Sequence, residues 1–181
     1  MTINITKTSS NLYALDNEFD LLLKMYNSEK FPKALMLSGK KGIGKCTLVN
    51  HFLTYIFDRE YDLKLKKINK LSQFYKQYEN NIFSNIIYLD GFVLKNVKID
   101  DIRKLKSTIL KSNISQMNRF IILDDIELFN DNSLNALLKI IEEPVSKNYY
   151  LIINNKSKPV MDTIKSRCLE FRISLNDRDR L

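Results

Sequence analysis

The residues most suited to chemistry form a short run early in the chain, where three of its four glycines fall within six positions. This run fits the pattern G-x-x-x-x-G-K and consists of Gly39, Lys40, Lys41, Gly42, Ile43, Gly44 and Lys45. Glycines at this spacing let successive backbone N–H groups turn toward phosphate oxygens, and a following helix N-terminus with a lysine adds positive charge. The run therefore predicts a binding loop for the phosphates of a nucleotide.

The residue after Lys45 departs from the full pattern. A loop of this type continues with Ser or Thr, whose hydroxyl binds Mg²⁺, whereas this chain has Cys46. Magnesium prefers oxygen ligands, and a thiol is a poor ligand for it. Thr47 carries a hydroxyl, but one step along a helix turns a side chain by about 100°. We therefore expect the loop from Gly39 to Thr47 to have ATP and Mg²⁺ as candidate cofactors. We also expect it to hold Mg²⁺ less well than a loop with the full pattern.

A second candidate group lies further along the chain, where the apolar run 120–123 ends in Asp124 and Asp125. A carboxylate at the end of a buried strand, beside a phosphate loop, predicts an indirect magnesium role for Asp124. P-loop proteins that hydrolyse their nucleotide usually have Glu after this Asp, and the Glu polarises the attacking water. Asp125 is one methylene shorter, so two interpretations stay open: a catalytic acid acting through a shifted water, or a helix-capping or solvated side chain.

These groups need a fold that brings them together, and the hydrophobic pattern predicts one. Short apolar runs alternate with segments whose apolar residues recur at helical spacing. The expected strands cover 34–37, 86–89, 120–123, 149–153 and 168–173, and the expected helices cover 11–28, 46–57, 63–78, 100–110, 131–142 and 159–165. This alternation favours an α/β fold with a mainly parallel sheet covered on both faces, formed by one domain over residues 1–181.

The composition limits the remaining classes. The chain has 181 residues, 44% hydrophobic and 28% charged, and no apolar run has the roughly 20 residues of a membrane span. We expect a cytoplasmic protein without membrane contact. Its two cysteines, Cys46 and Cys168, have no metal-binding spacing, so no zinc is expected. The net charge of +8 comes mainly from lysines, and a solvated basic surface is favoured over a dedicated nucleic-acid patch.

Two further features allow more than one interpretation. His51 lies on the expected helix after the loop and, without a visible partner, is expected to pack there. The aromatic residues after it interleave with lysines, and they are Phe74, Tyr75, Tyr78 and Phe83. Such a group can stack nucleic-acid bases, but the core face of an irregular helix is the favoured interpretation.

A later stretch carries a family resemblance. Residues 135–144 read N-A-L-L-K-I-I-E-E-P, and they resemble the N-A-L-L-K-x-x-E-E-P signature of clamp-loader ATPase subunits of the AAA+ class. Downstream, Ser166, Arg167 and Cys168 resemble the Ser-Arg-Cys motif of the same subunits. With the phosphate loop and the Asp124 strand, the resemblance covers residues 15–175. Order and spacing are most similar to the delta-prime subunit of bacterial DNA polymerase III, and next to the gamma/tau subunit.

The resemblance implies a P-loop NTPase fold of the RecA-like type, a three-layer sandwich, in a complex that opens a sliding clamp and places it on primed DNA. The implied partners are gamma/tau and delta subunits and, through the complex, the clamp and primer-template DNA. Arg167 matches the arginine finger, which stabilises charge on the γ-phosphate in a neighbouring subunit's ATP site. Asn155 matches the first sensor, whose side chain contacts the γ-phosphate or its water.

The sequence also departs from this family. Gamma/tau subunits carry a four-cysteine zinc module between the phosphate loop and the acidic strand, where this chain has no cysteine. The family's helical lid and collar domain are expected to be absent from this chain. Three functions stay open: a delta-prime-like subunit that supplies a finger and hydrolyses little ATP, a gamma-like motor ATPase in which Thr47 or water replaces the missing hydroxyl, and a P-loop ATPase that remodels another nucleic-acid complex.

Overall fold

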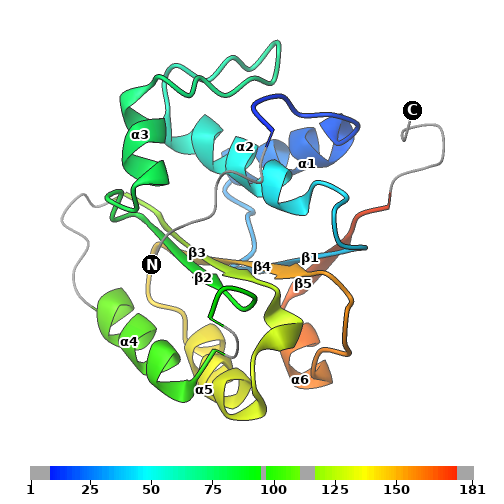
Figure 1. Ribbon diagram of the computed structural model, residues 1–181, viewed down its shortest axis with the longest axis vertical. Coiled ribbons are helices and arrows are strands. Elements are labelled where there is room, and N and C mark those ends of the chain that lie inside the picture. Colours follow the sequence, from blue (N-terminus) through cyan, green and yellow to red (C-terminus); the bar gives the residue numbers. More distant parts are fainter. Residues whose placement is uncertain (1–8, 95–96, 111–116, 175–181) are drawn as a thin grey trace. The chain divides into compact units, whose positions relative to one another are not determined.

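The computed structural model describes residues 9–94, 97–110 and 117–174, and these residues fall into two compact units. The first unit contains residues 9–31, Gly42–Phe83 and 173–174, and the second contains Pro32–Lys41 and the described part of Ser84–Arg172. Figure 1 shows the helices and strands of both. Within the described ranges, none of the helices combines the length and the apolar character that a bilayer span requires.

The second unit is built around a five-stranded sheet (Figure 1). Its strands are β1 (Ala34–Ser38), β2 (Ile86–Asp90), β3 (Arg119–Asp124), β4 (Asn148–Asn154) and β5 (Leu169–Arg172), in the order β2-β3-β4-β1-β5. Every neighbouring pair is parallel, which confirms the predicted α/β class with a parallel sheet. The register pairs Asp90 with Asp124 and Ser38 with Asn154, so the carboxyl ends of four strands meet at one edge.

Three helices and a short turn of 3₁₀-helix complete this unit. They are α4 (Ile99–Leu110), α5 (Asp131–Glu142), α6 (Asp162–Lys165) and η2 (Ile126–Leu128). The helices lie on the same face of the sheet (Figure 1), and their apolar side chains share one core with alternate residues of the strands. All residues of β1 and β3 are buried, because their continuous apolar runs leave no polar face for water.

Helix α5 shows how local sequence sets its limits. The Asn130 side chain accepts a hydrogen bond from the Ser133 amide at 2.8 Å, which satisfies one of the exposed N–H groups of the first turn. Pro144, two residues after the last helical residue, has no amide hydrogen and cannot continue the helix. The predicted helix over 131–142 is therefore confirmed with the same bounds.

The first unit contains the helices α1 (Asp16–Asn27), α2 (Lys45–Phe57) and α3 (Gln73–Glu79). The ring of Phe19 on α1 meets the ring of His51 on α2 edge to face, with centroids 6.4 Å apart. His51 is completely buried, and its Nδ1 lies 2.9 Å from the Tyr61 hydroxyl oxygen. The expectation that His51 packs within this helix layer is confirmed.

The predicted helix over 63–78 is wrong, because only its C-terminal part, α3, is helical. Residues 61–72 form turns and short bridges, which join Lys67 to both Asn11 and Asp62. The ammonium of Lys66 lies 2.8 Å from a carboxylate oxygen of Asp16 and 3.1 Å from one of Asp20. Backbone groups of the segment also pair outside a helix: the Leu12 amide donates to the Lys66 carbonyl at 3.3 Å, and the Ile68 amide donates to the Ser10 carbonyl at 2.8 Å. These bonds to the N-terminal part of the chain take the place of helical hydrogen bonds.

The aromatic group around α3 faces inward. Phe74, Tyr75 and Tyr78 are all buried, and the Tyr78 hydroxyl donates to the Asn50 side-chain oxygen at 2.6 Å. Phe74 also stacks on Phe57 of α2, with ring centroids 6.0 Å apart. Phe83 is only partly buried, and its ring meets that of Phe74 edge to face with centroids 5.0 Å apart. The core interpretation is confirmed for Phe74, Tyr75 and Tyr78, and for these three the alternative of a base-stacking surface is wrong.

Candidate nucleotide site

The glycine-rich loop stands between β1 and α2, as the sequence predicts. The Gly39 amide donates to the Asn154 carbonyl at 3.1 Å, which extends the pairing of β1 with β4 into the loop. Gly42 and Gly44 have φ angles of +88° and +92°, a region that side chains other than glycine rarely adopt. A Cβ atom on Gly44 would also lie 2.9 Å from the Leu15 side chain. The backbone therefore requires glycine at Gly44, whatever the loop binds.

Helix α2 begins directly after the loop. Lys45 is its first residue and is only 2% exposed, whereas Lys40 and Lys41 before it are exposed. Cys46 and Thr47 follow in the same turn, and both are partly exposed. Neither Cys46 nor Cys168, the chain's two cysteines, forms a disulfide, so Cys46 presents a thiol where a hydroxyl is usual.

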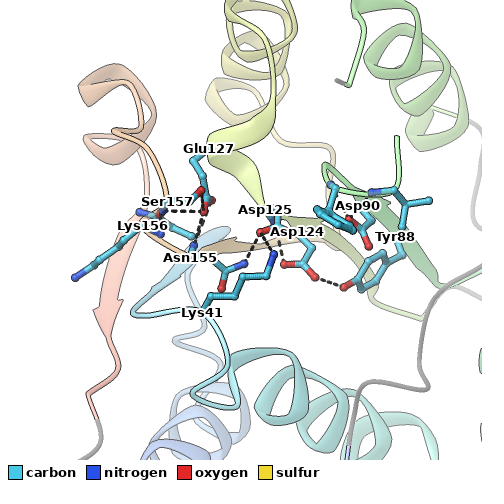
Figure 2. A network of polar contacts seen from close by, with 12 residues as sticks. Lys41, Tyr88, Asp90, Asp124, Asp125, Glu127, Asn155, Lys156 and Ser157 are labelled. Atoms are coloured by element: carbon cyan, nitrogen blue, oxygen red, sulfur yellow. Dashed lines mark hydrogen bonds and ion pairs between the residues drawn. The ribbon is translucent and has the colours of Figure 1, made fainter. Parts of the chain in front are cut away.

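Asp124 ends β3 and is held by two donors (Figure 2). One carboxylate oxygen accepts the Asp125 amide at 2.8 Å, and the other accepts the hydroxyl of Tyr88 at 2.5 Å. Tyr88 lies on β2, next to β3, and the sequence reasoning missed it. The sequence shows only that Tyr88 is a residue with a hydroxyl in the predicted strand 86–89, and it does not show that this strand lies beside the one that ends in Asp124. The two donors fix the carboxylate of Asp124, which is 7% exposed, in one orientation.

Asp125 is buried, at 6% exposure, and has a left-handed backbone with φ of +50°. Its side chain makes no capping bond to η2, so the interpretation as a helix-capping or solvated acid is wrong. The carboxylate instead accepts the side-chain amide of Asn155 at 2.6 Å and lies 3.7 Å from the Lys41 ammonium (Figure 2). The structure thus brings together three residues that the sequence singled out separately.

Glu127 is the residue of this edge that sequence reasoning missed most clearly. It is 6% exposed, and its carboxylate accepts the Asn155 amide at 3.0 Å. It also accepts the amide and the hydroxyl of Ser157, at 3.3 Å and 2.9 Å. Glu127 thereby holds the segment after β4, and with it Asn155, against the segment after β3 (Figure 2). Its position between Ile126 and Leu128 could have indicated a buried acid, because a carboxylate between apolar residues needs donors to satisfy it.

Gly91, the fourth glycine of the chain, lies at the same edge of the sheet as Asp124 and Asp125. The Gly91 amide donates to the Asp124 carbonyl at 2.9 Å. A Cβ atom on Gly91 would lie 2.6 Å from the Asp125 carbonyl oxygen, closer than real Cβ atoms come to backbone. Glycine at this position therefore lets the end of β2 approach the two aspartates.

Arg167 makes its described contacts elsewhere, at the end of α6. Its guanidinium contacts the carboxylate of Glu142 at 2.6 Å, and it donates to the Thr163 carbonyl at 2.9 Å. Its side chain remains 37% exposed. Cys168, the next residue, is less exposed to solvent, and burial raises the pKa of its thiol to about 12, which keeps the thiol protonated.

The donor set at the strand edge fits a hydrated magnesium ion better than a directly bound one. Both oxygens of Asp124 already accept a hydrogen bond. Within the described residues, no three His, Cys, Asp or Glu side chains converge as metal ligands. A magnesium ion at Asp124 would therefore be held through its water molecules.

Solved structures with a similar fold define the class of protein. A DNA polymerase III gamma-subunit-related protein from Thermotoga maritima matches with a TM-score of 0.60 and 19% identity, over 92% of this chain and 48% of that one. The RuvB Holliday junction branch migration motor from the same organism matches with a TM-score of 0.55 and 16% identity, over 88% and 44%. With the strand–loop–helix and the acidic strand end, these likenesses identify an α/β fold of the P-loop NTPase class.

Within that class the family is also clear. The chain belongs to the family described as "DNA polymerase III, delta subunit", whose model matches residues 15–177, and this confirms the resemblance to clamp-loader subunits of the AAA+ class.

Individual relatives support the same family. The chain is 24% identical over 165 residues to DNA polymerase III subunit delta' of Buchnera aphidicola subsp. Baizongia pistaciae, covering 88% of this chain and 49% of the relative. It is 25% identical over 148 residues to DNA polymerase III subunit gamma of Buchnera aphidicola subsp. Acyrthosiphon pisum, covering 82% and 40%. The chain thus spans half or less of the length of these relatives.

Proposed function

We propose that this chain is the nucleotide-binding domain of a delta-prime-like subunit of the DNA polymerase III clamp loader. In this proposal residues 1–181 form one domain, which assembles with gamma/tau and delta subunits. The complex loads the sliding clamp onto primer-template DNA. The chain supplies Arg167 to the ATP site of a neighbouring subunit and hydrolyses little or no ATP itself.

The observation that carries the proposal is a contrast between Arg167, which could act on a neighbour's nucleotide, and the chain's own loop and acidic strand end. Arg167 presents a partly exposed guanidinium, which always carries its charge and whose donors match phosphate oxygens. The chain's own loop has a thiol at Cys46, and the carboxylate of Asp124 is already engaged by Tyr88. These features support a subunit that acts on another subunit's nucleotide more than on its own.

The proposed roles of the other residues follow from their positions. Backbone amides from Gly39 to Thr47 and the Lys45 ammonium would hold nucleotide phosphates. Asn155 would contact the γ-phosphate or its water, and Asp125 would orient that water as a slow base. The bond from Asn155 to Asp125 supports the two acting together.

Steady-state ATP hydrolysis by the isolated chain tests the proposal. We expect turnover far below the roughly one per second at the low end of ordinary enzymes, with no further loss in Lys45→Ala. In a complex with the gamma subunit of the same organism, Arg167→Ala should lower hydrolysis at the facing site by about 10³-fold, a magnitude typical of arginine fingers. Arg172→Ala, another exposed arginine paired with an acid, is the matched control and should have no effect. Turnover near one per second that Lys45→Ala abolishes would reject the proposal.

A gamma-like motor is the second candidate, and the similarity to gamma subunits favours it, since the identity of 25% to a gamma subunit is close to the 24% to a delta' subunit. In a motor, Thr47 or water would replace the missing hydroxyl. Calorimetric titration with ATP separates the two: a motor predicts micromolar affinity that depends on Mg²⁺, and the delta-prime-like subunit predicts little effect of Mg²⁺. Failure to bind gamma and delta subunits would exclude both in favour of another nucleic-acid-remodelling complex.

A further inference from the structure

The surroundings of Arg167 suggest how this arginine is kept in position before it meets a partner. Both Nε and Nη2 of its guanidinium contact the same carboxylate oxygen of Glu142, each at 2.6 Å. Nη1 donates to the Thr163 carbonyl at 2.9 Å and lies 3.4 Å from the Ser166 hydroxyl. Most of the N–H groups of the guanidinium are therefore engaged within the chain.

The backbones that carry this pair are firmly placed, although the pair itself is not buried. Glu142 is the last residue of α5, and Arg167 follows α6 by two residues. Ile141, the neighbour of Glu142 on α5, and Ile164, on α6 three residues before Arg167, belong to one apolar core. The side chains of Arg167 and Glu142 are 37% and 44% exposed, so the two groups meet at the surface between fixed elements.

The edge of the guanidinium that Glu142 engages is one through which arginine binds phosphate. Arginine binds carboxylate and phosphate in the same way, with two parallel N–H groups on one edge of its planar fork. The Nε–Nη2 edge of Arg167 is occupied by Glu142, and Nη1 is directed to the Thr163 carbonyl. The other two-donor edge shares Nη1, which is directed to the Thr163 carbonyl and the Ser166 hydroxyl. A phosphate can therefore bind the Nε–Nη2 edge through two bonds only when the Glu142 carboxylate leaves.

We propose that Glu142 is a positioning residue that occupies the phosphate-binding edge of Arg167 and is displaced when a neighbouring subunit presents its nucleotide. This inference rests on the proposed role of Arg167. Ion pairs at such exposure are weak, because water competes for both partners. Glu142 therefore holds the side chain in one place without preventing its release, and removing its charge should change the action of Arg167 only a few-fold.

The first test examines the pair in the isolated chain. The Nε–H resonance of Arg167, assigned by its loss in Arg167→Lys, should shift and exchange faster with water in Glu142→Gln. Glu143→Gln is the matched control, because Glu143 is the adjacent exposed carboxylate and has no described contact with Arg167. Inorganic pyrophosphate, used as the probe, should shift this resonance at lower concentration in Glu142→Gln than in the unmodified chain. A resonance unchanged by Glu142→Gln would overturn the inference.

The second test measures the consequence in the assembled complex with gamma and delta subunits. Glu142→Gln should lower the concentration of this chain that half-maximally stimulates ATP hydrolysis by about two- to five-fold. The maximal rate should stay the same, since Arg167 itself is intact. A merely structural role of Glu142 would raise that concentration or lower the maximal rate, and either result would overturn the inference.

The controls separate this inference from the proposed function. If Arg167→Ala lowers stimulated hydrolysis but Glu142→Gln changes neither parameter, the positioning role fails and the arginine finger stands. If Arg167→Ala has no effect, the proposed function fails and the positioning role fails with it. Stimulation that improves in Glu142→Gln, and not in Glu143→Gln, supports both.

Discussion

Two carboxylates in this molecule each receive several donors, and they differ chiefly in burial. Glu127 is 6% exposed and holds the segment that carries Asn155, whereas the Glu142 side chain is 44% exposed and holds Arg167. Water cannot replace lost hydrogen bonds at the buried group, but it can at the exposed one. The comparison teaches that the same interaction fixes a candidate sensor in one place and leaves a candidate finger free to change partner in the other.

The largest expected effect comes from removing the buried acid. Glu127→Ala leaves the Asn155 amide and the amide and hydroxyl of Ser157 without their acceptor. Asn155 is partly buried and Ser157 is exposed, so water can reach part of the freed donors. Because each hydrogen bond to a charged group contributes about 1.5–3 kcal/mol, we take the lower end for these three bonds and expect the free energy of unfolding to fall by about 4 kcal/mol. Urea denaturation measures this value. Glu143→Ala, at an exposed carboxylate, should change it by less than about 0.5 kcal/mol, and a similar value for both variants would remove the contrast.

A pH titration tests whether burial also has a large effect on stability in the first unit, which contains His51. Burial lowers the pKa of His51 from 6.5 to about 4, so the folded state keeps it neutral while the unfolded state takes up a proton below pH 6.5. The stability that neutral His51 contributes is complete above pH 6.5 and is lost as the pH falls to 4, by about 3 kcal/mol.

His51→Gln is the reference for this titration. Carboxylates also titrate between pH 7 and pH 4, but their contribution to the free energy of unfolding is the same in the unmodified chain and in this variant. The difference in free energy of unfolding between the unmodified chain and His51→Gln, measured by denaturation at pH 7 and at pH 4, should change by about 3 kcal/mol. A difference that is independent of pH would mean that His51 is accessible to protons in the folded state.

The smallest effect should come from the exposed pair. Glu142→Gln removes one charge from a surface ion pair, and such pairs contribute about 0–1 kcal/mol. We expect the free energy of unfolding to fall by less than about 1 kcal/mol, and by less still at high salt because the pair is screened. A loss that approaches the value for Glu127→Ala would show that exposure does not distinguish the two carboxylates.

Much of the fold and part of the site could be predicted from the sequence, because the signals are local. Continuous apolar runs predict the buried parallel strands, and the Asn130 cap and Pro144 set the limits of α5. The conformation of Gly44 is likewise a property of the loop itself. Asp124 could be singled out because a carboxylate directly follows an apolar strand.

The rest depends on contacts between distant segments, which spacing does not encode. Tyr88 reaches Asp124 from another strand, and Glu127 meets Ser157 from another loop. Gly91 matters only because two strand ends approach each other. The wrong helix over 63–78 has the same cause, since Lys66 and its neighbours bind the N-terminal part of the chain.

The strand order also governs when the molecule can assemble during synthesis. β1 leads into the glycine-rich loop and lies between β4 and β5, and the facing residues Ser38 and Asn154 are 116 positions apart. A ribosome therefore completes β1 long before either of its partners exists, and pairing over such separations is slow. The nascent apolar strand therefore stays without its sheet partners until β4 has emerged, so an early apolar segment must be kept from other contacts during most of synthesis.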